Sequence, residues 1–130
     1  MTSLMSIRIG TNDMARASAF YEATFGALGF PANSAPAEYP ILMYRLPGGP
    51  AFFVGGAANG QPATHANGGT IGLIAPDDAA VGAWHAAGLA NGGTCEGAPG
   101  PREMAGGKQG AYLRDPDGNK LCVYAGLTLG

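Results

Sequence analysis

A chain of 130 residues, with 46% hydrophobic and only 12% charged side chains, is long enough for one folded domain and too apolar to be disordered. Its formal net charge of −2, without any basic tract, argues against nucleic acid as a partner. No run approaches the length of a membrane span, and the first eight residues lack a signal-peptide pattern, so we expect no membrane association. Cys95 falls in a glycine-rich loop and Cys122 on a predicted inner strand, which is poor evidence for a disulfide and favours a reduced, cytoplasmic protein.

The first half of the sequence predicts a strand, a helix and a hairpin. Alternation over residues 4–10 places Ile7 and Ile9 on one face of a strand. Residues 11–13 offer N-cap side chains, and apolar residues then recur at helical spacing as far as Leu28. Glycines at 26 and 29 are expected to end this helix. Strands at 41–46 and 51–54 flank a Pro-Gly-Gly-Pro turn and form the hairpin.

The second half repeats this order. A strand is predicted at 70–75, residues 76–78 open a helix, glycines 92 and 93 end it, and a glycine-rich loop follows to residue 110. An offset of 64 residues aligns three pairs in the two halves: Ser6 with Thr70, Asp13 with Asp77, and Phe20 with Trp84. The prolines of the two hairpin turns, Pro47 and Pro116, lie 69 residues apart. The pattern indicates a duplicated supersecondary unit whose second copy is longer.

The closing hairpin carries the most specific string. Residues 111–113 and 121–124 are apolar and flank Asp-Pro-Asp-Gly-Asn, whose residues favour a tight turn. The whole segment YLRDPDGNKLCVY, residues 112–124, resembles the C-terminal signature of the vicinal oxygen chelate superfamily, which includes glyoxalases, bleomycin resistance proteins and extradiol dioxygenases. Residues 7–30 resemble the opening strand and helix of the same family, and residues 70–93 extend the resemblance.

The resemblance implies an α+β fold in which tandem βαβββ modules form a half-barrel sheet with the helices outside. We expect a single domain over residues 1–130, with module 1 at about 4–55, a loop at about 55–69 and module 2 at about 70–126. The family also implies a homodimer, because its members often complete the cavity between two chains. Whether the two modules pair within one chain or across the dimer is left open by the sequence.

Strand alternation predicts which side chains face the cavity. If the isoleucines, leucines and valines of the first and last strands pack against the helices, the opposite faces carry the candidate ligand-binding residues: Ser6, Arg8, Phe53, Thr70, Cys122 and Tyr124. Metal-dependent members of the family take His, Glu or Gln ligands from positions that fall here on Ser6, Phe53, Thr70 and Cys122. None of these residue types matches, so we predict neither a metal site nor a cofactor.

Arg8 is the strongest candidate, since a guanidinium suits a carboxylate, phosphate or enolate oxygen. The alternatives are an internal ion pair with Glu38, Glu96 or Glu103, or a solvated position at the rim. Phe53, Tyr124 and Tyr44 could form an aromatic wall for a planar ligand, or they could fill the core.

The remaining titratable residues offer weaker candidates. His65 precedes the second module and either lies in solvent or leans towards the cavity, whereas His85 is expected to point to solvent. Cys122 is expected to be inert, and Asp115 and Asp117 to serve the hairpin turn. No catalytic residue is assigned.

These features favour a metal-independent protein that binds a small anionic or aromatic ligand in the sheet cavity, as resistance-type members do. One alternative is an enzyme acting on a small carbonyl or carboxylate substrate through Arg8, although the predicted faces hold no general base. The other is a metal-dependent, glyoxalase-like lyase or isomerase or a dioxygenase, which requires a different register at several strands. The identity of the ligand is not indicated by the sequence.

Overall fold

The structure is a computed structural model that describes residues 3–126. The first half contains β1 (Ser6–Gly10), α1 (Met14–Ala27), β2 (Ile41–Arg45) and β3 (Ala51–Gly55). The second half contains β4 (Ile71–Ala75), α2 (Asp78–Ala90), β5 (Thr94–Pro101), the 3-10 helix η1 (Glu103–Ala105), β6 (Gln109–Arg114) and β7 (Lys120–Ala125). Both predicted hairpins are confirmed, because β2 pairs antiparallel with β3, and β6 with β7.

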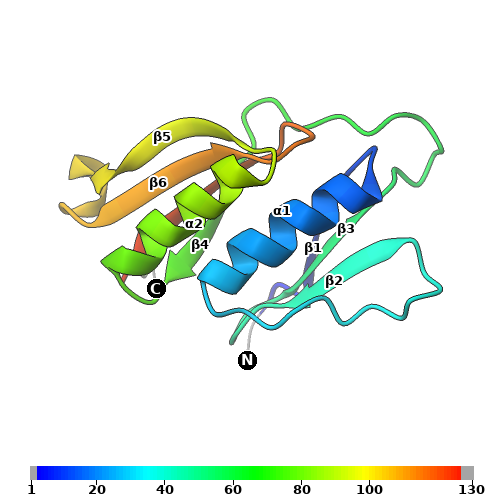
Figure 1. Cartoon of the computed structure of the whole chain (residues 1–130), viewed down its shortest axis with the longest axis horizontal. Helices are drawn as coiled ribbons and strands as arrows, with labels where there is room; N and C mark the ends of the chain where they lie inside the picture. The colour runs from blue at the N-terminus through cyan, green and yellow to red at the C-terminus, as the bar shows by residue number, and fades with distance from the viewer. Residues whose placement is uncertain (1–2, 127–130) are drawn as a thin grey trace.

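The strands form two mixed sheets, and neither closes into a barrel. The three-stranded sheet has the order β1-β3-β2, and the four-stranded sheet has the order β4-β7-β6-β5. In each sheet the first strand of its half pairs in parallel with the last, β1 with β3 and β4 with β7. Helices α1 and α2 lie side by side across the same side of the molecule, over the two sheets (Figure 1). The predicted α+β class and its helix-covered sheets are thereby confirmed.

The duplicated pattern is visible in matching structural roles. Asp13 and Asp77 each cap a helix, and their carboxylates accept hydrogen bonds from the backbone N–H of Arg16 at 3.0 Å and of Ala80 at 2.8 Å. Phe20 and Trp84, the other aligned pair, are both completely buried. The two halves therefore share helix starts and core positions in the structure as well as a residue pattern in the sequence.

The predicted end of the first helix needs a correction. Gly26 lies inside α1, and Leu28 is the C-cap. Gly29 follows with φ of 78°, in the left-handed region that glycine adopts at little cost. Only the second of the two glycines therefore ends the helix.

The predicted glycine-rich loop after α2 also needs a correction, because its first part is the eight-residue strand β5. Glycine and proline are depleted in strands, which is why TCEGAPGP predicted a loop. The strand tolerates them because it lies at the edge of its sheet and shifts register twice along β6. The described structure has no corresponding strand between α1 and β2, and β5 is the main addition to the second half.

The core lies between the helices and the inner faces of both sheets. Leu73, Leu121 and Val123 are buried there, and Ile7 and Ile9 pack against the same cluster. This confirms the predicted alternation, since the inward residues are the ones that the pattern assigned to the helices. The largest buried side chains come mainly from the helices and the first sheet: Phe20, Tyr21, Phe25, Tyr44, Phe52 and Trp84.

The closing hairpin also forms hydrogen bonds with the start of the first helix. Asp115 stabilises the turn, because its Oδ1 accepts from the backbone N–H groups of Asp117 and Asn119, each at 2.9 Å. The Asp117 carboxylate, however, accepts from the Thr11 hydroxyl, from the Asn12 backbone at 3.0 Å and from Arg16 at 3.2 Å. The prediction that Asp117 serves only the turn is therefore wrong: it joins the last hairpin to the start of α1.

Candidate functional site

The face of each sheet turned away from the helices is called its open face here. Alternation opposite the buried residues places Ser6, Arg8 and Phe53 on the open face of the first sheet. The same argument places Cys122 and Tyr124 on the open face of the second sheet, where they form a small cluster with Ala105 and Tyr112. Thr70 is exposed in the loop immediately before β4. Five of the six predicted residues thus fall into two groups, on sheets that share no strand pairing, and Thr70 lies outside both sheets.

Arg8 lines a shallow, polar pocket between the end of β1 and loop 56–69, which follows β3. The pocket encloses about 280 Å³, and its wall includes Gly10, Gly56, Asn59 and Thr64. One guanidinium nitrogen of Arg8 donates a hydrogen bond of 2.9 Å to the carbonyl of Gly56. The pocket contains none of the other five predicted residues.

Arg8 is not neutralised within the described chain. Among residues 3–126 no carboxylate lies at ion-pair distance from its guanidinium. Glu96, one of the carboxylates considered for it, pairs instead with Arg114. Arg8 is also exposed, so its remaining donors are open to a ligand from solvent.

Phe53 lies beside Arg8 in the sheet. It is the register partner of Arg8 on β1 and of Met43 on β2, and it is only partly buried. Neighbouring positions on one face of a sheet bring side chains into contact range. The first open face therefore combines a cation with an aromatic ring.

A pair of phenols dominates the second open face. The hydroxyl oxygens of Tyr112 and Tyr124 lie 2.7 Å apart, and their rings meet edge to face at a centroid distance of 6.0 Å. Lys120 and Arg102 place cationic atoms 5.5 and 5.8 Å from the Tyr112 ring centroid. The hydrogen bond with Tyr124, followed by desolvation, raises the pKa of Tyr112 to about 12, so this phenol stays protonated at neutral pH.

Tyr112 was not among the residues predicted from the sequence, although a signal for it existed. Its side chain faces Cys122 across the β6–β7 ladder. Extending the alternation from β7 to its partner strand would have identified it.

Cys122 is a buried thiol beside these phenols. Burial raises its pKa, although the nearby Tyr112 hydroxyl and Lys120 partly oppose that shift. The protonated form dominates at neutral pH, and a protonated thiol is a poor nucleophile. This environment agrees with the expectation of an inert cysteine.

The residues at the four positions that correspond to the metal ligands of metal-dependent members do not fit a metal site. Hydroxyl, phenyl and a protonated thiol at Ser6, Thr70, Phe53 and Cys122 do not supply the imidazole and carboxylate ligands of such sites. In the part of the chain that the structure describes, no three His, Cys, Asp or Glu side chains gather in a way that could hold an ion. We therefore derive no chemistry through a metal.

The two histidines differ from each other. His65 is exposed, and its ring lies over the closing turn, where a Cβ on Gly118 would stand 2.7 Å from its Nδ1. His85 was expected to point to solvent, and that prediction is wrong. It is 8% exposed, and its Nε2 lies 3.2 Å from the sulfur of Cys95. The error arose because β5, the strand that brings Cys95 to α2, was read as a loop.

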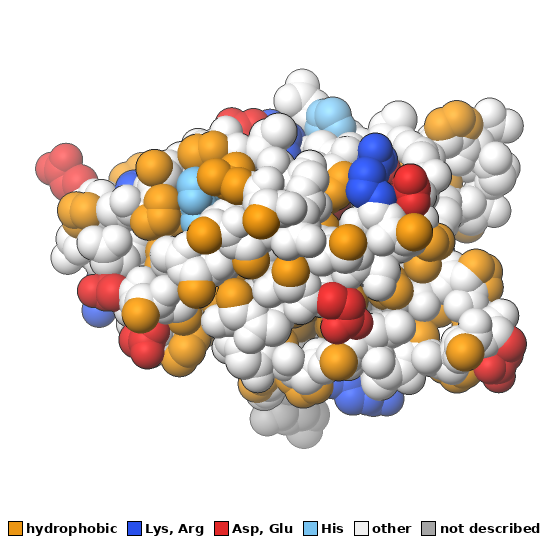
Figure 2. Space-filling model, viewed as in Figure 1, with side chains coloured by type: hydrophobic (Ala, Val, Ile, Leu, Met, Phe, Trp, Pro, Cys, Tyr) orange, Lys and Arg blue, Asp and Glu red, His pale blue; other side chains and the backbone are white. Residues whose placement is uncertain are grey.

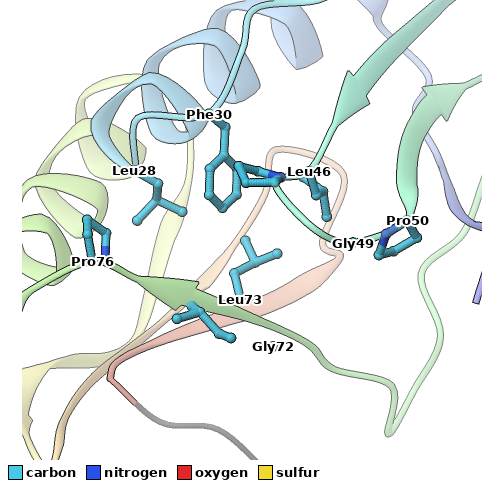
Figure 3. A pocket seen from close by; sticks show the side chains of 10 residues that line it. Leu28, Phe30, Leu46, Gly49, Pro50, Gly72, Leu73 and Pro76 are labelled. Carbon is cyan, nitrogen blue, oxygen red and sulfur yellow. The ribbon is translucent and has the colours of Figure 1, made fainter. Parts of the chain in front are cut away.

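A larger hollow lies elsewhere, between the end of α1, the β2–β3 turn and β4 (Figure 3). It measures about 410 Å³, and Figure 3 shows Leu28, Phe30 and Leu73 pointing into it. Its side chains are apolar, and none of the six predicted residues lines it. Without a polar group to orient a ligand, this hollow is a weaker candidate than the open faces.

The charges on the helix side of the molecule are mixed. Figure 2 shows charged side chains of both signs scattered over this face, without a patch of one sign. Within residues 3–126, neither α-helix combines the length and the apolar character that crossing a membrane requires.

Comparison with known proteins identifies the family. The sequence profile of the Glyoxalase/Bleomycin resistance protein/Dioxygenase superfamily matches residues 3–123. A glyoxalase/bleomycin resistance protein from Albidiferax ferrireducens T118 is 43% identical, with a TM-score of 0.86 over 95% of this chain and 99% of that chain.

More distant structures share the fold. A glyoxalase-related enzyme from Fulvimarina pelagi is 17% identical, with a TM-score of 0.75 over 96% of this chain and 88% of its own. A lactoylglutathione lyase from Agrobacterium tumefaciens is 23% identical, with a TM-score of 0.65 over 97% of this chain and 95% of its own. No curated protein matches the sequence. The profile match over nearly the whole chain shows that this protein belongs to the glyoxalase/bleomycin resistance protein/dioxygenase superfamily.

Proposed function

We propose that this protein binds a small anionic ligand with an aromatic or otherwise planar part, and that it does so without a metal. The observation that carries the proposal is Arg8, an exposed guanidinium at a polar pocket without a carboxylate partner among the described residues. A guanidinium offers several N–H donors in a plane and binds carboxylate or phosphate oxygens by two of them at once.

The groups around Arg8 suggest the shape of the ligand. Phe53 is its neighbour across the ladder and offers a ring against which a planar group can stack. On the second open face, the hydroxyls of Tyr112 and Tyr124 hydrogen-bond to each other, and their rings offer further aromatic surface. An anionic end at Arg8 and a planar body would use both kinds of contact.

A homodimer is part of the proposal. Arg8 and Phe53 lie on one sheet, whereas Tyr112 and Tyr124 lie on the other, and no strand joins the two sheets. A ligand that uses both groups needs the two open faces brought together, and a second chain is one way to do this. The same arrangement would leave the ligand largely enclosed, as small-molecule sites usually are.

Binding is favoured over catalysis by the chemistry of these faces. None of the six predicted side chains is a base at neutral pH, and the raised pKa of Cys122 keeps that thiol protonated. Proton abstraction from a carbon next to a carbonyl would need such a base. We expect the protein to sequester its ligand rather than convert it. The expected location is the cytoplasm, in keeping with two free cysteines.

The decisive variant is Arg8→Ala, compared with Arg16→Ala. Both changes remove one positive charge, but Arg16 lies on α1 and does not line the Arg8 pocket, and its partner Asp117 keeps the hydrogen bonds from Thr11 and Asn12. A ligand carried through purification, or an aromatic carboxylate found by screening, is titrated by calorimetry. We expect Arg8→Ala to weaken binding at least about tenfold, the loss of a charge-assisted hydrogen bond, with Arg16→Ala unchanged. Equal affinity in Arg8→Ala and wild type would remove Arg8 from the site.

A further inference from the structure

A thiol–imidazole pair lies on the helix side of the second sheet, away from its open face. Cys95 on β5 is an exposed free thiol, and the Nε2 atom of His85 on α2 lies 3.2 Å from its sulfur. His85 is more than nine-tenths buried, and the thiol is the only hydrogen-bond partner that the described structure gives it. A buried imidazole aimed at an accessible sulfur is the arrangement that activates cysteines.

The fold holds this pair in place. Cys95 is the register partner of Leu113, so its side chain lies on the helix side of β5. Helix α2 approaches β6 closely at Gly88, where a Cβ would stand 2.3 Å from the Leu113 side chain. His85 lies one turn before Gly88, and the close approach brings its ring to Cys95.

The surroundings leave room for a modified sulfur. β5 is the outer strand of its sheet, and Thr94, Cys95 and Glu96 are all exposed. The other cysteine, Cys122, is buried on the opposite face of the sheet. The two thiols therefore differ in access and in neighbours, although both are free.

Both tautomers of His85 assist reaction at the sulfur. Desolvation lowers the pKa of His85, which keeps the ring neutral at neutral pH. With its proton on Nδ1, the ring presents the Nε2 lone pair to the thiol; with its proton on Nε2, it donates a hydrogen bond to the sulfur.

We propose that Cys95 is a modification site at which low-molecular-weight disulfides form a mixed disulfide with the protein, with His85 as proton acceptor. The Cys95 sulfur attacks one sulfur of RSSR, and the new Cys95–S–SR bond forms as the RS–SR bond breaks. The thiol proton passes to Nε2 of His85 and then to the departing RS⁻, which leaves as RSH. The protein thiol is oxidised, and one half of the disulfide is reduced. This site does not depend on the ligand proposed above.

The test uses glutathione disulfide, with the rate of adduct formation followed by intact-mass spectrometry and the site located by peptide mapping. The matched control is the double variant Thr94→Cys/Cys95→Ser, which moves the thiol by one residue along β5 to the face without the imidazole. We expect wild type to react at Cys95 about tenfold faster than this control, because only the Cys95 sulfur has the imidazole beside it to take up its proton as it attacks.

The variant His85→Gln separates the imidazole from the position. It retains a hydrogen-bonding side chain but has no base, so its rate should fall to that of the control variant. If His85→Gln does not fold, the comparison between wild type and Thr94→Cys/Cys95→Ser still decides the matter. Equal rates for those two proteins, an unchanged rate in His85→Gln, or modification first at Cys122 would each overturn the proposal.

Discussion

Replacing Tyr21 with Phe should remove one of the bonds that hold the two halves of the chain together. Tyr21 is fully buried on α1, and its hydroxyl donates to Oδ2 of Asp115 on the closing hairpin at 2.6 Å. Burial and the nearby Asp115 charge raise the pKa of Tyr21 well above its ordinary value, which keeps the donor protonated. The bond connects residues 94 positions apart, from the first half of the chain to the last hairpin.

The magnitude follows from what remains after the change. Asp115 is only 3% exposed and keeps three donors: the backbone N–H groups of Asp117 and Asn119, and the Asn119 amide. The Phe ring preserves the packing, so no cavity forms. Loss of one hydrogen bond to a buried charge should lower the free energy of unfolding by about 2 kcal/mol. For a domain of this size that corresponds to a fall in Tm of about 6 to 10 °C.

The assay is urea unfolding at a fixed protein concentration, since assembly would otherwise shift the result. The matched control is Tyr44→Phe, because the Tyr44 hydroxyl donates at 3.2 Å to Glu22, which is exposed. That variant should lose less than about 1 kcal/mol, the usual range for a bond to a solvated partner. Equal losses of unfolding free energy in Tyr21→Phe and Tyr44→Phe would show that the bond to the buried Asp115 carboxylate is worth no more than a bond to a solvated one.

Two further predictions concern α2 and the second open face. Gly82→Ala should stabilise the protein by about 0.5 to 1 kcal/mol, since a Cβ there meets nothing within 4 Å. Gly88→Ala should destabilise it by about 1 to 3 kcal/mol, because its Cβ would push on Leu113. Urea unfolding of both variants checks this, and a change of the same sign in both would contradict it. Tyr112→Phe should flatten the loss of stability in alkali. The pKa of Tyr112 is raised to about 12 from an unfolded value of 10.0, so its contribution is complete below pH 10 and is lost as the pH rises to about 12; a slope identical to that of wild type would show that the shift is absent.

Much of the fold could be predicted because the first and last strands of each half follow simple alternation. Ile7, Leu73 and Val123 lie on the helix side, as the pattern indicated. The helix caps at Asp13 and Asp77 were also readable, since a capping carboxylate acts within three residues. Alternation and capping depend on residues that are close together in the chain, so the sequence alone indicates them.

The parts that could not be predicted depend on contacts between distant segments. β5 is rich in glycine and proline, and only its pairing with β6 makes it a strand. Without β5, neither the burial of His85 nor its contact with Cys95 could be foreseen. The bonds of Asp117 to Thr11 and Asn12 likewise join residues more than a hundred positions apart. The candidate ligand residues remain a prediction, although Arg8 and Phe53 are neighbours in the sheet.

The most direct test of the central proposal is native mass spectrometry of protein purified without a chelator, combined with elemental analysis for metals. We expect a species of two chains of 13.0 kDa each that contains almost no transition metal and releases a small anion on activation. Loss of that anion in Arg8→Ala, but not in Arg16→Ala, would connect it to the pocket at Arg8. One tightly held transition metal per chain would contradict the account, because it would mean that residues other than those on the open faces form the site.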